Sequence, residues 1–333
     1  RDSSVTGVQT CALPILLRAV AIAFLVSGLC GAAAAQTYPS RPIRVIAANS
    51  AGGTSDIFLR ALGDEFQKRT GQPLVIENRS GGGMNIAGRA CADAPNDGYT
   101  LCMLPNEPLT LNEFTFKSIS FRPEKDFVPI TNCFINTQVM VVSAKLGVKT
   151  LDELAALSRQ KPGTLSYSAL AIPMQITMEN WKKKTGADVV ALPARGGGDI
   201  VTGLMTGTAP IAIVGLPNFL EHIRSGAVHA IAVDGDARSP QLPNIPTFAE
   251  IGYPNLAPVY FAFVAPAGTP STLINEFYQK VREIGDDPAF RQRRLLDLGL
   301  VPVFDKPAEF AEYLKQQREN SRRLIAESGY EPR

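Results

Sequence analysis

Short apolar runs alternate with amphipathic, helix-like segments along most of the chain. The apolar run at 43–47 has the length of a buried strand, and a glycine-rich turn separates it from a helix expected over 55–70. Apolar residues recur in that helix every three or four positions, as one buried helix face requires. The same order of strand, turn and helix returns further along the chain. This alternation predicts an α/β fold.

The pattern predicts the approximate bounds of each element. Strands are expected at 43–47, 73–77, 99–104, 128–133, 138–142, 165–168, 189–192, 209–214, 227–233 and 260–265. Helices are expected at 55–70, 85–92, 151–159, 176–185, 199–206, 218–225, 271–284, 289–298 and 307–328. At the start of the helix at 151–159, Thr150 and Glu153 have the spacing of a capping box. No segment repeats at periods of 20–50 residues, which argues against solenoids and propellers.

The order of these elements predicts two lobes with a cleft between them. One α/β unit is followed by a second, and a later strand leads back to the first before helices close the chain. We therefore place hinge crossings near 137–142 and 257–264. Residues 36–136 and 257–333 should form one lobe, and residues 137–256 the other.

The N-terminal 35 residues predict an export signal. Arg18 supplies the positive charge, residues 19–29 the apolar stretch, and residues 33–35 a small-residue cleavage site, so the mature chain should start at Gln36. The apolar stretch is about half of the roughly 20 residues that a membrane span needs, which disfavours the alternative of a retained anchor. Residues 1–15 fit no part of the signal, and we interpret them, as a hypothesis, as a sequence artefact. We expect a periplasmic protein.

Composition excludes several classes of partner. The chain has 333 residues, of which 45% are hydrophobic, and this content suffices for two domains. With 33 Lys and Arg against 31 Asp and Glu, the net charge of +2 gives no attraction to nucleic acid or to an anionic membrane. We therefore expect no nucleic-acid partner.

Three of the five cysteines, Cys91, Cys102 and Cys133, lie in the expected mature chain. An exported protein meets an oxidising compartment, so one disulfide can form and one thiol would remain. The sequence does not say which pair forms. The alternative for at least one of them is a small buried hydrophobic residue.

Three segments combine a strand end, a turn of small or polar residues and a helix start, at 49–56, 167–175 and 193–199. A helix N-terminus exposes free amide N–H groups and carries a partial positive charge. Small residues let a ligand approach this backbone, so such turns bind anions without Lys or Arg. In open α/β sheets they lie where ligands collect, at the carboxyl ends of strands.

The candidate ligand-binding residues come from these turns. They are Asn49, Ser50, Gly52, Gly53, Thr54, Ser55, Ser168, Ala169, Gln175, Gly197, Gly198 and Asp199. Structural roles are the alternatives: Thr54 and Ser55 can cap a helix, and Arg195 can be a solvated loop charge. For Asp56 and Asp199 we favour the role of first-turn acids that complement the helix dipole.

Signals for catalysis are weak. Both histidines of the expected mature chain, His222 and His229, lie away from the glycine turns, and structural use is favoured. Metalloprotease, nucleophile-elbow and Walker motifs are lacking, and His, Cys and carboxylates do not cluster as metal ligands do. Residues 81–83 lack the glycine spacing of a dinucleotide site. We expect no enzyme, no cofactor and no metal.

Six motifs, in this order and spacing, resemble the Bug family of solute receptors, which serve tripartite tricarboxylate transporters. They lie at 38–43 (YPSRPI), 51–56 (AGGTSD), 77–86 (ENRSGGGMNI), 95–101 (PNDGYTL), 242–250 (LPNIPTFAE) and 265–270 (APAGTP). The resemblance covers nearly all of 38–333. It implies a type II periplasmic-binding-protein fold, in which two α/β lobes joined by two hinge strands close on a ligand like a Venus flytrap.

The resemblance also implies how a ligand is held. The ligand is a small organic molecule, often a carboxylate, which backbone amides, hydroxyls and waters hold in the cleft. The matching positions here are Gly52, Gly53, Thr54, Ser55, Gly197 and Gly198.

The chain departs from the family's pattern around this expected site. Ala48-Asn49-Ser50 stands where the family commonly has Pro-Phe-Pro, and Ala194 where it commonly has Tyr. In the second turn, Ser168-Ala169 and Met174-Gln175 replace the usual Ser-Gly and Ser-His. Relative to the family's pattern, the expected site therefore lacks two aromatic side chains and has one additional side-chain amide. We hypothesise a larger or more polar ligand than a short dicarboxylate, with Asn49 and Gln175 supplying hydrogen bonds.

These features predict a periplasmic solute receptor. It should bind a small organic, carboxylate-containing ligand between its lobes and deliver it to the integral-membrane subunits of a tripartite tricarboxylate-type transporter. The receptor should be a monomer. The alternative is a sensor that reports the ligand to a two-component kinase, and the neighbouring genes would separate the two. An enzyme on the same fold would need an acid, base or nucleophile in the cleft, and the sequence offers none.

Overall fold

The computed structural model describes residues 2, 38–194, 196–235, 237–253 and 258–332. By its internal contacts the chain divides into residues 1–40 and residues 41–333, and the fold described below is that of residues 41–333. The predicted export signal, Arg195 and the start of the second predicted crossing at Ala257 lie outside the described residues.

A six-stranded sheet organises the first part of the fold, in the order β11-β4-β10-β3-β1-β2. Its strands are β1 (Ile43–Ala47), β2 (Leu74–Asn78), β3 (Thr100–Pro105), β4 (Phe127–Asn136), β10 (Tyr260–Pro266) and β11 (Leu300–Pro302). β1 pairs in parallel with both β2 and β3, while β10 runs antiparallel between β3 and β4. The carboxyl ends of β1 and β3 therefore lie side by side.

A five-stranded sheet organises the second part, in the order β7-β6-β8-β5-β9. Its strands are β5 (Gln138–Ser143), β6 (Leu165–Ala169), β7 (Val189–Ala191), β8 (Ile211–Gly215) and β9 (Val228–Val233). β6 pairs in parallel with β7 and β8, and β5 runs antiparallel between β8 and β9.

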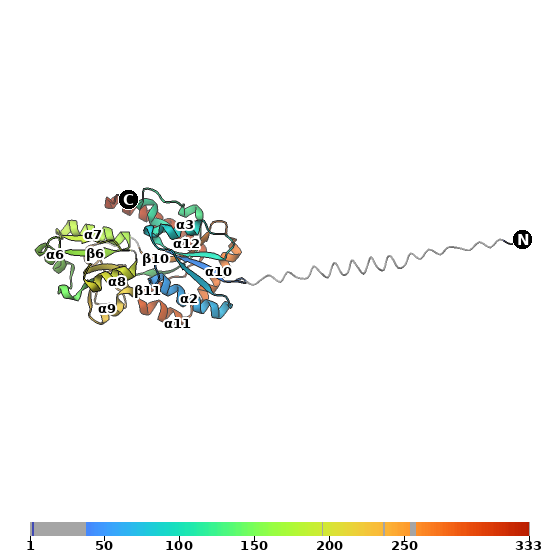
Figure 1. Cartoon of the computed structure of the whole chain (residues 1–333), viewed down its shortest axis with the longest axis horizontal. Helices are drawn as coiled ribbons and strands as arrows, with labels where there is room; N and C mark the ends of the chain where they lie inside the picture. The colour runs from blue at the N-terminus through green and yellow to red at the C-terminus, as the bar shows by residue number, and fades with distance from the viewer. Residues whose placement is uncertain (1, 3–37, 195, 236, 254–257, 333) are drawn as a thin grey trace. The chain divides into compact units, whose positions relative to one another are not determined.

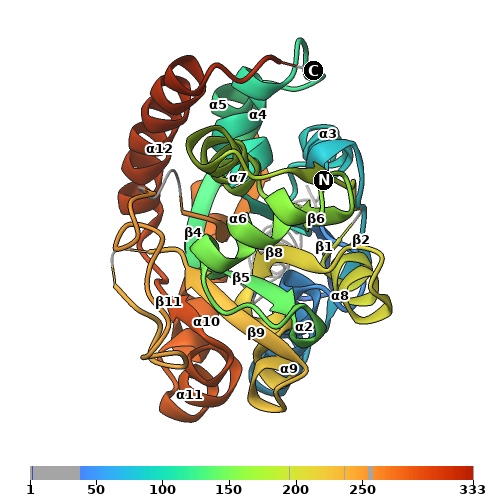
Figure 2. The ribbon, with the colours of Figure 1, turned by 90° about the vertical axis from the view of Figure 1, so that its left-hand side faces the viewer.

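Helices cover both sheets, as Figures 1 and 2 show. On the six-stranded sheet lie α2 (Thr54–Thr70), α3 (Asn85–Ala92), α4 (Asn112–Thr115), α5 (Pro123–Asp126), α10 (Ser271–Gly285), α11 (Pro288–Arg294) and α12 (Pro307–Ser328). On the five-stranded sheet lie α6 (Leu151–Gln160), α7 (Ile172–Thr185), α8 (Gly197–Thr206) and α9 (Leu220–Arg224). Short 3₁₀ turns are η1 (Gly82–Met84), η3 (Ala144–Leu146), η4 (Leu216–Asn218) and η5 (Leu296–Leu298), and η2 (Glu107–Leu111) is a π-helical turn.

Each sheet has its own apolar core. One core gathers residues such as Ile46, Leu104 and Phe310 from the six-stranded sheet and its helices. The other gathers residues such as Val141 and Leu204 from the five-stranded sheet and its helices. We call these two parts the first and the second lobe. The predicted two-lobed α/β fold is confirmed.

The chain passes from one sheet to the other at a single residue. β4 of the first lobe ends at Asn136 and β5 of the second begins at Gln138, so only Thr137 lies between them. The return runs between β9 and β10. Gln138 is held at this junction because its backbone N–H donates to the buried carboxylate of Asp234, which follows β9.

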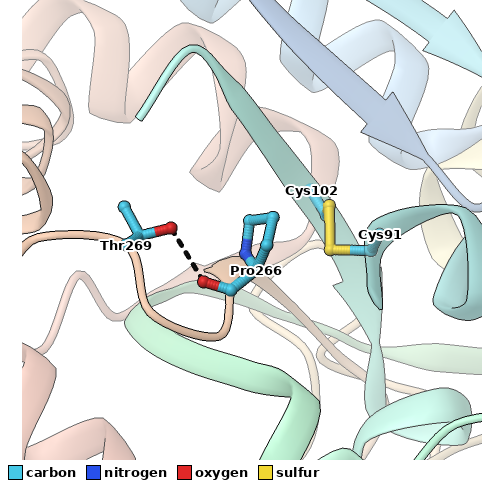
Figure 3. The surroundings of a disulfide bond; sticks show 4 residues. All are labelled: Cys91, Cys102, Pro266 and Thr269. Atoms are coloured by element: carbon cyan, nitrogen blue, oxygen red, sulfur yellow. Dashed lines mark hydrogen bonds between the residues drawn. A yellow bond between two sulfur atoms is a disulfide. The ribbon is translucent and has the colours of Figure 1, made fainter. Parts of the chain in front are cut away.

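A disulfide links Cys91 on α3 to Cys102 on β3 (Figure 3). Cys102 pairs across the sheet with Val264, close to the turn in which Thr269 donates to the carbonyl of Pro266. Cys133 is a buried free thiol, and burial raises its pKa well above the usual range. The first lobe thus holds the one disulfide and the one free thiol of the described residues.

Most predicted elements lie within a few residues of the observed ones, and the exceptions have local causes. Thr150 caps α6 as predicted, by accepting from the N–H of Glu153. The helix expected at 176–185 begins earlier, at Ile172, because Pro173 suits the first turn of a helix. The expected helices at 218–225 and 289–298 are each split into an α-helix and a 3₁₀ turn. The turns over 107–115 and strand β11 were not predicted.

Candidate functional site

Two neighbouring cavities lie between the lobes, with volumes of about 560 Å³ and about 30 Å³. The lining of both includes Asn49, Met84, Glu107 and Leu170, so the small cavity adjoins the large one. From the first lobe, the large cavity is lined by Ala48, Asn49, Gly81–Met84, Glu107, Asn112 and Phe116. From the second lobe, it is lined by Tyr167, Ala169, Leu170, Ile172, Gln175, Ala191–Ala194 and Gly196.

Helix N-termini from both lobes meet at these cavities. Gly53 and Thr54 at the start of α2 line the small cavity, as do Ala171 before α7 and Gly197 at the start of α8. None of the three helices has a side-chain hydrogen bond at its N-cap. No capping side chain therefore competes for their first-turn amides, and the helix dipoles add a partial positive charge. In α7, however, Pro173 has no N–H and the N–H of Met174 donates to the carbonyl of Ala171.

The first predicted turn contributes three of its six candidate residues to the cavities. Asn49 lines both, and Gly53 and Thr54 line the small one. Gly52 lies outside, in a left-handed conformation at φ 78°, and its N–H donates to Asp56. Asp56 also binds Arg60, which confirms the structural role favoured for this acid.

Ser50 and Ser55 line neither cavity. Ser55 is fully buried within α2. The N-cap of α2 is Gly53, so the hydroxyls of Thr54 and Ser55 do not cap this helix. Ser50 instead lies against the third turn. A Cβ atom added to Gly196 would be only 2.5 Å from the Ser50 hydroxyl oxygen. The first and third turns therefore touch across the cleft.

The second turn places Ala169 and Gln175 at the large cavity. The side-chain nitrogen of Gln175 donates to the backbone carbonyls of Ala169, at 2.9 Å, and Leu170, at 3.2 Å. Because both hydrogens of this amide serve the turn itself, Gln175 offers a ligand its carbonyl oxygen rather than a donor. Ser168 lines neither cavity, and its hydroxyl donates to the carbonyl of Leu192.

The third turn brings Gly196 to the large cavity and Gly197 to the small one. Gly198 and Asp199 are exposed and line neither, because successive residues of a helix point in different directions. Ligand binding by these two residues stays a prediction. The histidines, His222 and His229, do not line the two cavities, and His229 lies 3.1 Å from the carbonyl of Val148.

Further contacts join the lobes around the cavities. Asn218 of the second lobe donates to the hydroxyl of Thr54, at 3.4 Å, and to the carbonyl of Gly215. An apolar cluster beside the large cavity packs Leu111 and Ile325 of the first lobe against Ile172 and Ile176 of α7. The two lobes therefore contact each other around the cavities.

Glu107 is the main residue that the sequence reasoning missed. It lines both cavities, and 4% of it is exposed. Burial raises the pKa of its carboxyl group to about 7, since a charged carboxylate loses its water there. The available signal was its position just after the predicted strand at 99–104, because the carboxyl ends of neighbouring parallel strands form ligand sites.

Other side chains at the cavities were also missed. Asn112 lines the large cavity and donates to the carbonyl of Gly83 and to Asn85. Asn136 and Gln138, on either side of the Thr137 crossing, line the small one. No three His, Cys, Asp or Glu side chains of the described residues gather as a metal site.

Comparisons with known proteins agree on one family. The family model described as the tripartite tricarboxylate transporter family receptor matches residues 58–330. Protein BugT of Bordetella pertussis is 31% identical over 318 residues, covering 94% of this chain and 97% of BugT.

Solved structures give the same picture. A structure of a periplasmic transporter has a TM-score of 0.80 and 30% identity, covering 87% of this chain and 97% of that one. R. palustris Rpa4515, solved with adipate, has a TM-score of 0.81 and 26% identity, covering 89% of this chain and 100% of that one.

Proposed function

Because the chain belongs to the receptor family of tripartite tricarboxylate transporters, we propose that it captures a small organic acid in the periplasm. It delivers this ligand, chemically unchanged, to the integral-membrane subunits of such a transporter. The partners are the acid and those subunits, and the receptor acts as a monomer without enzymatic activity. Export by the N-terminal signal brings it to the periplasm.

The convergence of the N-termini of α2, α7 and α8 on adjoining cavities is the observation that carries this proposal. Such N-termini bind a carboxylate through backbone N–H groups and dipoles without a basic side chain. The larger cavity, about 560 Å³, lies within the roughly 300–1,000 Å³ of small-molecule pockets. Rpa4515, which shares the fold at 26% identity, was solved with the dicarboxylate adipate.

Capture and release follow from movement of the lobes. We propose that residues 36–136 and 257–333 move as one body and residues 137–256 as the other, with Thr137 as one hinge point. A ligand that touches both lobes favours the closed form by the difference between its affinities for the closed and open forms. The contact between Ser50 and Gly196 and the hydrogen bond between Asn218 and Thr54 would break on opening.

The proposal is tested by identifying the ligand and by placing a charge in the cavity. Mass spectrometry of protein purified without added ligand should reveal an organic acid. Calorimetry with adipate as the probe should show saturable binding at one site. In Ala194→Asp, a carboxylate in the large cavity should weaken adipate binding at least about tenfold by like-charge repulsion.

Val190→Asp is the matched control, since Val190 is exposed in the same lobe and lines neither cavity. Its affinity for adipate should equal that of the wild type. Equal losses in the two variants would contradict a carboxylate in this cavity. Conversion of the bound acid to a product during long incubation would overturn the receptor proposal.

A further inference from the structure

A further cavity, of about 400 Å³, lies at the edge of the second lobe's sheet that is farthest from the cleft, and we call it the peripheral cavity. It shares no lining residue with the two cleft cavities. One side is Val228–Ala230 of β9, the edge strand beside α9 (Figure 2). Its volume lies within the roughly 300–1,000 Å³ of small-molecule pockets.

The opposite wall, residues 241–245, is held in place by side-chain hydrogen bonds. The side chain of Gln241 accepts from Arg224 of α9 at 2.8 Å. The guanidinium of Arg238 donates to the carbonyl of Pro243 at 3.3 Å. Because the wall is already ordered, a ligand that enters the cavity has less chain to immobilise.

The outer edge of β9 is covered at the end of the strand nearest the Thr137 crossing. There the N–H of Val233 donates to the carbonyl of Pro246 at 3.0 Å, and the N–H of Phe248 donates to the carbonyl of Val233 at 2.9 Å. An extended peptide therefore cannot pair along the whole strand. The remaining space suits a compact small molecule rather than an added β-strand.

Much of the lining is apolar and belongs to the core of the second lobe. Val228, Ala230 and Leu242 are buried members of that core, and Ile223 and Ile245 pack against it. The core is thus open to the cavity at this edge of the sheet. A hydrocarbon group placed here would remove apolar surface from water, which is favourable.

Another part of the lining is basic. The ammonium group of Lys149 has no carboxylate partner among the described residues, and Glu153, which accepts from the backbone N–H of Lys149, does not line the cavity. Nδ1 of His229 lies 3.1 Å from the carbonyl of Val148. Since a carbonyl only accepts, Nδ1 carries the proton, and Nε2 is the ring nitrogen left for a ligand. Among the described residues, no Asp or Glu lines this cavity.

We propose that the peripheral cavity binds an apolar monocarboxylate. Its carboxylate lies at Lys149 and His229, and its hydrocarbon body packs against Ile223, Leu242 and Ile245. A second carboxylate would be desolvated against the apolar lining without a partner, which is costly. This site goes beyond the proposed function, because it lies outside the cleft and takes a different class of acid.

Calorimetry with 3-phenylpropanoate as the probe, in excess adipate, tests the proposal. Saturable binding at one site is expected. The neutral amide 3-phenylpropanamide has nearly the same shape and should bind about 3–10-fold more weakly, as expected for the loss of a partly exposed charge pair. An amide that binds as tightly as the acid would overturn the proposal, as would displacement of the probe by adipate.

Lys149→Met removes the charge and keeps most of the side chain's length. It should weaken 3-phenylpropanoate about 3–10-fold and leave the amide unchanged. Lys145→Met is the matched control, because Lys145 is exposed in the preceding turn and lines none of the three cavities. It should keep the wild-type affinities. Equal losses in the two variants would contradict a carboxylate at Lys149.

Hydrogen exchange locates the probe without relying on the cleft. Bound 3-phenylpropanoate should slow exchange at 228–230 and 241–245 and leave the cleft turns at 49–56 and 167–175 unchanged. Slowing confined to the cleft turns, or no slowing, would overturn the peripheral site. The proposed function is unaffected by that result, since adipate binding in the cleft is measured separately.

Discussion

The two walls of the cleft differ in chemistry. The wall from the first lobe carries the buried oxygens of Asn49, Glu107 and Asn136. The wall from the second lobe is made mostly of small or apolar residues, such as Ala169 and Leu170, and of backbone at Gly196 and Gly197. We infer that the first lobe selects the chemical group of the ligand, and that the second lobe closes over it.

The lobes differ in covalent structure as well. The first contains the disulfide between Cys91 and Cys102, on elements next to the cavity-lining strand ends. The second has no cysteine anywhere between residues 138 and 233. A selective wall benefits from a rigid frame, because its acceptors must hold their positions before the ligand arrives. The second lobe, which closes over the ligand, needs only a complementary shape and the freedom to move.

The largest expected effect comes from removing the disulfide. Cys91→Ala with Cys102→Ala opens a loop with a sequence separation of 11, and the free energy of unfolding should fall by about 2–3 kcal/mol. Urea denaturation would measure the loss. Hydrogen exchange should quicken in α3 and β3 and stay unchanged in β6 and β8. Wild type treated with a reductant is the control, and uniform quickening in both lobes would contradict the comparison.

A smaller effect, on affinity alone, should follow from Gly196→Val. A side chain at Gly196 collides with Ser50 across the cleft, so the closed form is strained by roughly 1–3 kcal/mol while each lobe still folds. Calorimetry should show that adipate binds about 10–100-fold more weakly. Gly198→Ala is the matched control, because nothing lies near the added carbon. An unchanged affinity for adipate would contradict a bound form in which these two turns touch.

The smallest expected effect is a pH dependence from the selective wall. With a pKa of about 7, the carboxyl of Glu107 is about one-tenth ionised at pH 6 and about nine-tenths at pH 8. Since the ionised form repels a carboxylate, affinity for adipate should fall by up to about tenfold over this range. Calorimetry at both pH values measures the change, and Glu107→Gln should reduce it. An affinity for adipate that rises toward pH 8 would contradict this prediction.

Two other carboxyl groups titrate in this range, because burial raises the pKa of Asp234, which accepts from the N–H of Gln138 at the small cavity, to about 7 and that of Asp305 to about 6. Other groups near Glu107 should not contribute to this profile. Burial raises the pKa of Tyr260 above its usual value and that of Tyr313 to about 12, and both tyrosines stay neutral over this range. The remaining charges packed near this segment are held in pairs, namely Arg318 with Glu113 and Glu124 and Arg89 with Asp93. Cys102 is in the disulfide and does not titrate.

The fold could be predicted because its signals are local and repeated. A five-residue apolar run gave β1 correctly, and the spacing of Thr150 and Glu153 gave the start of α6. Glycine turns before helices located Gly53 and Gly197 at the cavity, since strand ends and helix starts follow from the α/β alternation.

The chemistry of the wall could not be predicted in the same way. Glu107 lies in a π-helical turn with no apolar period, so no element was expected there. Whether a helix residue faces the cavity depends on where the helix begins, and Gly198 and Asp199 therefore point elsewhere. The hydrogen bond from Gln175 to the turn before it is a local side-chain contact that the strand-turn-helix pattern does not reveal.

The buried thiol of Cys133 gives the described chain a practical property. With Cys91 and Cys102 joined, no cysteine of residues 38–332 offers a reactive sulfur at the surface. One engineered cysteine on each side of the cleft could therefore take fluorescent dyes selectively. The distance between the dyes would then report opening and shutting in real time, and the receptor could serve as a sensor for its own cargo.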